Sequence, residues 1–214
     1  MPLVDFHLLL VTDRSVVRGR SLPSALEEAV DASVPAIQLR ERDLPTRDLL
    51  SLAQQIYAMT RGPAVPLIIN DRADIAVALD LDGVHLRATS LPVSVARQVV
   101  GARRFIGVSA HSVEEVQRAG DEGADYVILG PIFETPSKRE FGAPLGLAVL
   151  ADACRLSSIP VFAIGGITRA RIELVRDAGA FGVAMIGGIL GREDVGAATT
   201  EMCAAVRATW PSHS

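Results

Sequence analysis

Aromatic residues and cysteines are scarce in this chain, and both shortages narrow the kinds of protein it can be. Aromatic residues make up 4% of the 214 residues, whereas hydrophobic residues make up 49%. The core must therefore be mostly aliphatic, which suits a parallel β-sheet covered by helices. Cys154 and Cys203 occupy helix-like segments without a CxxC or Cys/His cluster. This pattern disfavours a metal cluster or a disulfide framework.

The sequence also lacks an excess of basic charge and any long apolar run. Its formal net charge is −4 at pH 7, and binding of a nucleic-acid backbone needs a concentrated basic face. The apolar run near the N-terminus ends at Asp13 and is too short for a signal peptide or a membrane span. We therefore expect a cytoplasmic protein with neither a nucleic-acid nor a membrane partner.

The chain does contain a regular alternation of short apolar runs and longer amphipathic stretches. The predicted strands are Leu8–Thr12, Ala36–Arg40, Pro66–Asn70, Gly83–Leu86, Phe105–Val108, Tyr126–Leu129, Val161–Ile164 and Gly182–Ile186. The predicted helices are Leu22–Ser33, Thr46–Thr60, Ala73–Asp80, Val93–Val100, Val113–Glu122, Gly146–Arg155, Arg169–Ala178 and Ala197–Ala208. Eight strand–helix units at this spacing predict one α/β domain over residues 1–214, a single (β/α)8 TIM barrel.

Polar residues follow most of the predicted strands. Because the carboxyl ends of barrel strands meet at one rim, where barrel enzymes keep their active sites, we expect these residues to converge. They are Gln38, Arg40 and Arg42 after the second strand, Asn70 and Asp71 after the third, His85 in the fourth, Ser109 after the fifth, and Thr135, Ser137 and Lys138 after the sixth.

Two glycine pairs follow the last two predicted strands. Gly165-Gly166 and Gly187-Gly188 stand where phosphate commonly binds in such barrels. Glycine turns before a helix expose backbone N–H groups to an anion, and Lys138 would add a charge. The alternative is that the glycines only permit tight turns. Two pairs at consecutive strand ends favour a phosphate site.

The remaining polar residues each have a structural alternative. Arginine suits bidentate recognition of phosphate or pyrophosphate, but Arg42 would equally pair with a neighbouring carboxylate. Asp71 would bind Mg²⁺, since one carboxylate plus substrate phosphates often suffices, or would cap the next helix. His85 would be an ordinary hydrogen-bonded core histidine, and Ser109 a turn or cap residue.

Five segments carry a family resemblance. They are QLRERD, INDRADIAVALDLDGVHL, GVSAHSVEEV, GADYVILGPIFETPSK and PVFAIGGI. In this order, from about Leu9 to Ile189, they resemble the thiamine phosphate synthase/TenI superfamily. The resemblance implies a Mg²⁺-dependent transferase of thiamine biosynthesis. Such an enzyme couples hydroxymethylpyrimidine pyrophosphate to thiazole phosphate and releases pyrophosphate.

The resemblance also implies roles for individual residues. Arg40, Ser109 and Lys138 would be catalytic, and Asp71 would hold Mg²⁺. Residues implied to bind the pyrimidine pyrophosphate are Gln38, Arg40, Arg42, Asn70 and His85. Residues implied to contact the thiazole side or the pyrophosphate are Thr135, Ser137, Lys138, Gly165, Gly166, Ile186 and Gly187.

One departure from the family pattern concerns the metal. The family's HLGQED segment reads HLRATS here, so Ser90 stands where a second Mg²⁺-binding aspartate belongs, which would weaken Mg²⁺ binding. A TenI-like thiazole tautomerase, which needs no Mg²⁺, is one alternative, although its characteristic histidine is Pro131 here. A non-catalytic regulatory barrel that binds thiazole phosphate is another. The apolar outer helices would suit either a homodimer interface or the shell of a barrel.

Overall fold

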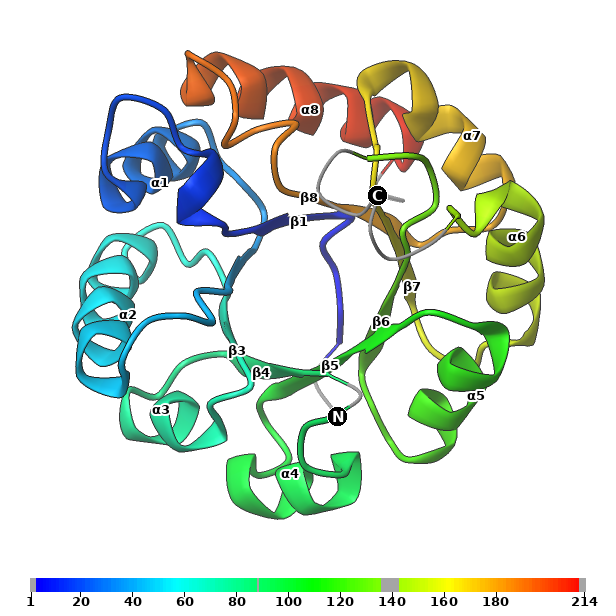
Figure 1. Cartoon of the computed structure of the whole chain (residues 1–214), viewed down its shortest axis with the longest axis horizontal. Coiled ribbons are helices and arrows are strands. Elements are labelled where there is room, and N and C mark those ends of the chain that lie inside the picture. The colour runs from blue at the N-terminus through cyan, green and yellow to red at the C-terminus, as the bar shows by residue number, and fades with distance from the viewer. Residues whose placement is uncertain (1–2, 88, 136–142, 212–214) are drawn as a thin grey trace.

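The computed structural model describes residues 3–87, 89–135 and 143–211. Eight parallel strands form a closed barrel in chain order, and the helices surround it (Figure 1). The strands are β1 (Leu8–Val11), β2 (Ile37–Leu39), β3 (Leu67–Asn70), β4 (Gly83–Leu86), β5 (Phe105–Ala110), β6 (Tyr126–Leu129), β7 (Val161–Ile164) and β8 (Gly182–Met185). The predicted TIM barrel is confirmed.

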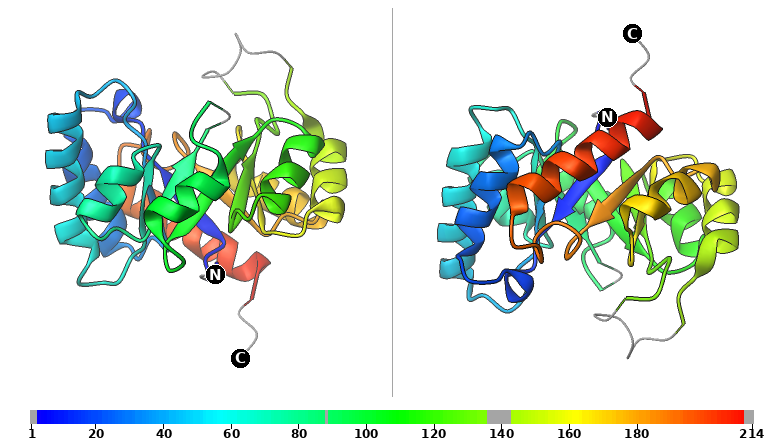
Figure 2. Two further views of the ribbon diagram at one scale, coloured as in Figure 1. Left: turned by 90° about the horizontal axis from the view of Figure 1, so that it is seen from below. Right: turned by 90° about the horizontal axis from the view of Figure 1, so that it is seen from above.

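Each strand leads into a helix that packs on the outside of the barrel (Figure 2). The α-helices are α1 (Leu22–Asp31), α2 (Thr46–Thr60), α3 (Ala73–Ala78), α4 (Val93–Val100), α5 (Val113–Asp121), α6 (Gly146–Leu156), α7 (Ile172–Asp177) and α8 (Val195–Thr209). Short 3-10 helices η1 (Arg14–Val16) and η3 (Arg169–Arg171) precede α1 and α7. Side-chain caps fix several starts: Ser21, Ser112 and Asp194 accept hydrogen bonds from backbone N–H groups in the first turns of α1, α5 and α8.

The segment before β1 fills the amino-terminal end of the barrel. It crosses the ring of strands in Figure 1, and the ring of Phe6 packs among those of Phe105, Tyr126 and Phe162 at centroid distances of 5.9, 6.3 and 5.6 Å. This buried cluster also includes Leu9 and other inward-facing strand residues. The amino-terminal end is thus packed, which leaves the carboxyl end for a ligand.

The predicted boundaries differ from the observed ones by a few residues. Strand β5 continues to Ala110, and α8 begins at Val195 because Asp194 caps it. The predicted helix over 169–178 is divided into η3 and α7, and η1 was not predicted. No helix in the described part of the chain is both long and apolar enough to cross a bilayer.

Candidate active site

A cavity of about 600 Å³ lies at the carboxyl ends of the strands. Nine of the predicted site residues line it: Gln38, Arg40, His85, Ser109, Thr135, Gly165, Gly166, Ile186 and Gly187. Arg42, Asn70 and Asp71 do not, and Ser137 and Lys138 fall outside the described residues. The predicted convergence on one rim is therefore observed for residues from β2, β4, β5, β7 and β8.

Strand alternation explains which side chains face the cavity. Residues two apart on a strand share a face, so Gln38 and Arg40 line the cavity together, as do Ser109 and His111. The Gln38 Nε2 group donates a hydrogen bond to Asn70 Oδ1 on the neighbouring strand β3 at 3.4 Å. Gln38 Oε1 is buried and has no hydrogen-bond partner among the described residues. A buried acceptor in this state suits a ligand that brings an N–H donor.

His85 is buried between Tyr126 and Ser109. Its Nε2 lies 2.8 Å from Ser109 Oγ and its Nδ1 lies 3.2 Å from the Tyr126 hydroxyl. Burial, reinforced by the Arg40 cation, lowers the pKa of His85 to about 3, so the ring is neutral at ordinary pH. Burial raises the pKa of Tyr126, whose hydroxyl therefore stays protonated and donates to Nδ1. The His85 Nε2–H group then donates to Ser109 Oγ and orients that hydroxyl.

A glycine makes this arrangement sterically feasible. A Cβ added at Gly107 would overlap the Tyr126 ring and lie 2.6 Å from His85 Nδ1. Gly107 pairs with His85 in the parallel ladder of β4 and β5 and with Tyr126 in that of β5 and β6. His85 is thus a hydrogen-bonded interior histidine, as the structural alternative held, and at the same time lines the cavity.

The backbone of Arg40 is fixed by a hydrogen bond, whereas its guanidinium faces the cavity. Its backbone N–H donates to Thr12 Oγ1 at 2.8 Å, and the Thr12 hydroxyl donates to Glu41 at 2.7 Å. In the described part of the chain, no carboxylate forms an ion pair with Arg40. Burial, and then the nearby cations of Arg42 and Arg87, lower the pKa of Arg40. Such a cation suits an anionic ligand.

The carboxylates next to Arg40 in the sequence form ion pairs with another arginine, Arg14. Glu41, only 5% exposed, and Asp43 both pair with Arg14, at 3.2 and 2.6 Å. The alternative in which Arg42 pairs with one of these carboxylates is therefore wrong. Arg42 is exposed and lies outside the cavity lining. The Glu41–Arg14 contact ties the loop after β1 to the end of β2 and so holds Arg40 in place.

Asp71 neither lines the cavity nor caps α3. The N-cap of α3 is Arg72, which makes no side-chain capping bond, so the capping alternative is wrong. The Asp71 backbone has a φ of 68°, and its N–H donates to the His85 carbonyl at 2.8 Å. Its Oδ2 accepts from Arg87 through Nε at 3.1 Å and through Nη2, and its Oδ1 accepts from the Ser90 hydroxyl. Both oxygens are therefore already engaged.

The two glycine turns lie side by side at the cavity wall but differ in what requires glycine. Gly165 and Gly166 have φ values of 97° and 63°, and a Cβ on Gly166 would lie 2.6 Å from the Glu134 carbonyl oxygen. The turn itself thus demands glycine there. A Cβ on Gly187 would meet nothing within 4 Å. Gly187 begins a helical turn in which Leu190 N–H donates to the Ile186 carbonyl at 2.9 Å, and the first N–H groups of such a turn lack partners within it.

Arg171 and His111 are two of the cavity-lining residues that were not among the predicted site residues. Arg171 donates from Nη1 to the Gly166 carbonyl at 2.7 Å, and its guanidinium lies 4.5 Å from the centre of the Phe133 ring. Arg171 belongs to η3, away from any strand end, so the pattern of polar residues at the strand ends does not point to it. His111 bonds through Nδ1 to the Gly130 carbonyl at 2.6 Å. Its spacing of two residues from Ser109 could have revealed it.

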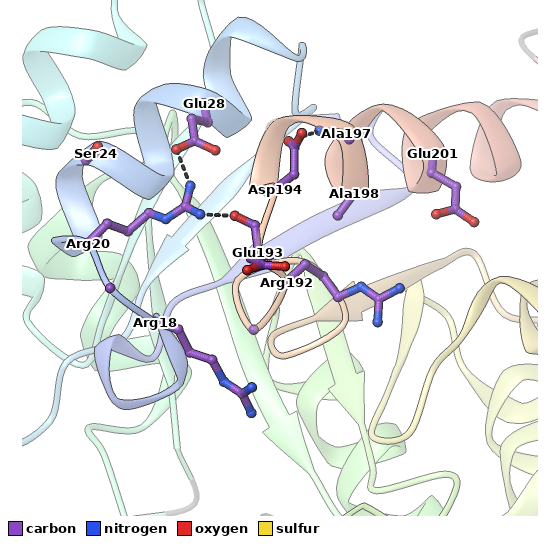
Figure 3. A pocket seen from close by; sticks show the side chains of 12 residues that line it. Arg18, Arg20, Ser24, Glu28, Arg192, Glu193, Asp194, Ala197, Ala198 and Glu201 are labelled. Atoms are coloured by element: carbon purple, nitrogen blue, oxygen red, sulfur yellow. Dashed lines mark hydrogen bonds and ion pairs between the residues drawn. The ribbon is translucent and has the colours of Figure 1, made fainter.

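A second, larger cavity of about 1090 Å³ lies outside the barrel, between the η1–α1 loop and the start of α8. Figure 3 shows Arg20 held between Glu28 and the Glu193 carbonyl, with Arg18 and Arg192 pointing away from that pair. Its lining mixes charges of both signs and includes none of the predicted site residues. The cavity at the strand ends is therefore the candidate active site.

A closed barrel with a half-buried arginine and two glycine turns at its carboxyl end belongs to the class of phosphate-binding (β/α)8 enzymes. Comparison with known families is more specific. The model of the family described as thiamine monophosphate synthase matches residues 8–189. The chain belongs to this family.

Individual relatives agree with the family assignment. The chain is 43% identical over 197 residues to a thiamine-phosphate synthase of Roseiflexus sp. strain RS-1, covering 92% of this chain and 84% of the relative. It is 45% identical over 194 residues to a putative thiamine-phosphate synthase of Geobacter sulfurreducens, covering 91% of each. The solved thiamine phosphate pyrophosphorylase of Pyrococcus furiosus superposes with a TM-score of 0.85 at 32% identity, covering 95% of this chain and 96% of that one.

Proposed function

We propose that this chain is a thiamine-phosphate synthase that joins hydroxymethylpyrimidine pyrophosphate to thiazole phosphate in one barrel domain. The similarity to thiamine-phosphate synthases over about nine tenths of the chain supports this activity. The structural observation that carries the proposal is that one cavity contains both Arg40 and the turn at Gly187. A coupling enzyme needs two anion sites that face one space.

The pyrimidine substrate is assigned to the β2–β5 side of the cavity. Its amino group would donate to Gln38 Oε1, the buried acceptor without a partner. Asn70 would act through Gln38, which it contacts. The pyrophosphate would lie against Arg40 and the Ser109 hydroxyl that His85 orients. Ser137 and Lys138 would add contacts to the same anion, whereas Arg42, which is exposed and outside the cavity lining, is assigned no contact to it.

The thiazole phosphate is assigned to the β7–β8 side. Its phosphate would bind the backbone of Gly165, Gly166, Ile186 and Gly187, and a helical turn begins at the last of these. Thr135 lines the cavity between the two sides. Apolar side chains of Val11, Ile128 and Met185 also line it and would exclude water from the two rings.

The coupling exchanges one bond for another. The bond between the pyrimidine methylene carbon and the pyrophosphate oxygen breaks, and its electron pair leaves with pyrophosphate. The lone pair of the thiazole nitrogen forms the new C–N bond to that carbon. No proton transfer is required, so the protein acts by stabilising negative charge on the leaving group and by aligning the acceptor. Arg40 is the described residue best placed for the first task.

Magnesium at Asp71 stays a prediction, and the donors present argue against it. Both Asp71 oxygens are engaged by Arg87 and Ser90, and no cluster of three His, Cys, Asp or Glu side chains exists in the described part of the chain. No step of this proposal is therefore assigned to a metal. The homodimer also stays a prediction.

The test measures thiamine phosphate made from the two precursors by wild type, Arg40→Ala and Arg72→Ala. Arg72 pairs with Asp74 outside the cavity, so its variant is the matched control. We expect Arg40→Ala to lower kcat/KM at least about 100-fold, because charge-assisted bonds strengthen in the transition state. Arg72→Ala should stay within about twofold. Isomerisation of a thiazole carboxylate phosphate without any coupling would instead identify a tautomerase.

A further inference from the structure

Arg87, Asp71 and Ser90 form a closed hydrogen-bonded unit just beyond the ends of β3 and β4. The Asp71 carboxylate accepts from the Arg87 guanidinium on one oxygen and from the Ser90 hydroxyl on the other. Ser90 Oγ in turn accepts from the Arg87 backbone N–H at 2.7 Å. Each member is thus held by the other two.

Ser90 and Arg87 both make the surroundings of Asp71 less suited to a metal ion than the family pattern implies. Where the resemblance implies two carboxylates around a divalent cation, the chain has one carboxylate, one hydroxyl and one guanidinium. Hard divalent cations prefer oxygen ligands, several of them anionic. A fixed positive charge already faces Asp71, so a metal ion would have to displace Arg87 and overcome its repulsion.

We propose that Arg87 takes the place of the divalent cation, so that this chain binds pyrophosphate without a metal. The inference rests on the proposed function only in naming pyrophosphate as the anion. Asp71 then acts as a positioning residue that fixes the guanidinium, and Ser90 fixes Asp71. Arg87 supplies the positive charge and planar N–H donors that suit phosphate oxygens.

The position of Arg87 supports this assignment. Arg87 directly follows β4 at the carboxyl end of the barrel, and its cation lies near enough to Arg40 to help lower the pKa of that guanidinium. Arg87 lines a cavity of about 240 Å³ that shares Ser109 with the main one. Arg40 and Arg87 directly follow β2 and β4, which are separated only by β3, so their backbones lie about 10 Å apart. Their side chains would grip one pyrophosphate from two sides.

The geometry of the ion pair leaves donors for the ligand. Only Nε and Nη2 of Arg87 contact Asp71, both on Oδ2. The guanidinium has five N–H donors, and the side chain is 40% exposed. A bidentate contact to a phosphate can therefore form without loss of the Asp71 contact.

The test is calorimetric binding of inorganic pyrophosphate to the whole chain, in EDTA and in excess Mg²⁺. We expect wild type to bind in EDTA with a Kd that Mg²⁺ changes by less than about threefold. Arg87→Ala should weaken binding in EDTA at least about tenfold, as expected for loss of a charge-assisted contact. The control Arg72→Ala removes an ion-paired arginine of the neighbouring loop and should change Kd less than about twofold. Binding by wild type only with Mg²⁺, or unchanged binding by Arg87→Ala, would overturn the proposal.

A second measurement needs no folded Arg87 variant. The thermal unfolding midpoint of wild type should be the same with Mg²⁺ and with EDTA, because a ligand stabilises only the state it binds. A rise with Mg²⁺ that Asp71→Asn abolishes would overturn the proposal. Neither experiment uses product formation. Binding of pyrophosphate without metal, but with no thiamine phosphate formed, would therefore count only against the proposed function. Formation of thiamine phosphate that strictly requires Mg²⁺ would count only against the proposed role of Arg87.

Discussion

At the scale of single residues, the site contains groups whose ionisation is fixed by burial. His85 is the clearest example, since its neutral ring lies between a phenol that donates and a serine that accepts. A buried neutral imidazole cannot serve as a general acid at ordinary pH, and the proposed coupling does not require one. Its role is to orient Ser109.

This burial predicts a pH dependence of stability. The pKa of His85 is about 3 in the folded chain and about 6.5 when unfolded. Between these values the unfolded state binds the proton and the folded state does not, so the free energy of unfolding falls as the pH falls from about 6.5 towards 3. His85→Gln should make this decline shallower in urea titrations at several pH values. Identical slopes for the two proteins would contradict the assignment.

Arg171 gives a second prediction at this scale. Because its guanidinium lies against the Gly166 carbonyl at the phosphate end of the cavity, Arg171→Ala should raise KM for thiazole phosphate about tenfold. The KM for the pyrimidine substrate should change little. Arg176→Ala on α7 removes an arginine that pairs with Asp177 outside the cavity and serves as control. Equal KM values for Arg171→Ala and wild type would exclude this role.

At the scale of elements, the two glycine turns allow stability to be separated from binding. Gly166→Ala should lower the free energy of unfolding by about 1–3 kcal/mol, because a left-handed φ and a close carbonyl both oppose a Cβ. Gly187→Ala should leave stability nearly unchanged, since its Cβ meets nothing, yet raise KM for thiazole phosphate. Denaturant unfolding and steady-state kinetics of both variants provide the check. A Gly166→Ala protein as stable as wild type would refute the prediction about stability. A Gly187→Ala protein with the wild-type KM would refute the prediction about phosphate binding.

The elements themselves were largely predictable from the sequence. Most strands are buried and rich in aliphatic residues, and the longer helices have one apolar face, so the order of the elements could be inferred from the sequence. The side-chain contacts between different strands and loops were not predictable in the same way. One alternative paired Arg42 with Glu41 or Asp43, but both carboxylates pair with Arg14, because the loop after β1 folds over the end of β2. Asp71 was expected to bind a metal or cap a helix, but contacts Arg87 across neighbouring strands.

At the scale of the whole molecule, one end of the barrel contributes to stability and the other contains the cavity. The segment before β1 packs Phe6 into the amino-terminal end, whereas the active-site cavity occupies the other end. Phe6→Ala should therefore cost about 3–5 kcal/mol of unfolding free energy while KM for both substrates stays near wild type at low temperature. Leu3→Ala, at a side chain 84% exposed, should cost less than about 0.5 kcal/mol. A large change in KM for folded Phe6→Ala would show that the two ends are coupled.

The proposed reaction joins a pyrimidine pyrophosphate to a thiazole phosphate in this barrel. Its most direct test is to supply both precursors and quantify thiamine phosphate and released pyrophosphate in the same reaction, omitting each precursor in turn. A thiamine-phosphate synthase should make the two products in equal amounts, and neither product when either precursor is missing. Tight binding of thiazole phosphate with no product, both in Mg²⁺ and in EDTA, would contradict the proposed function.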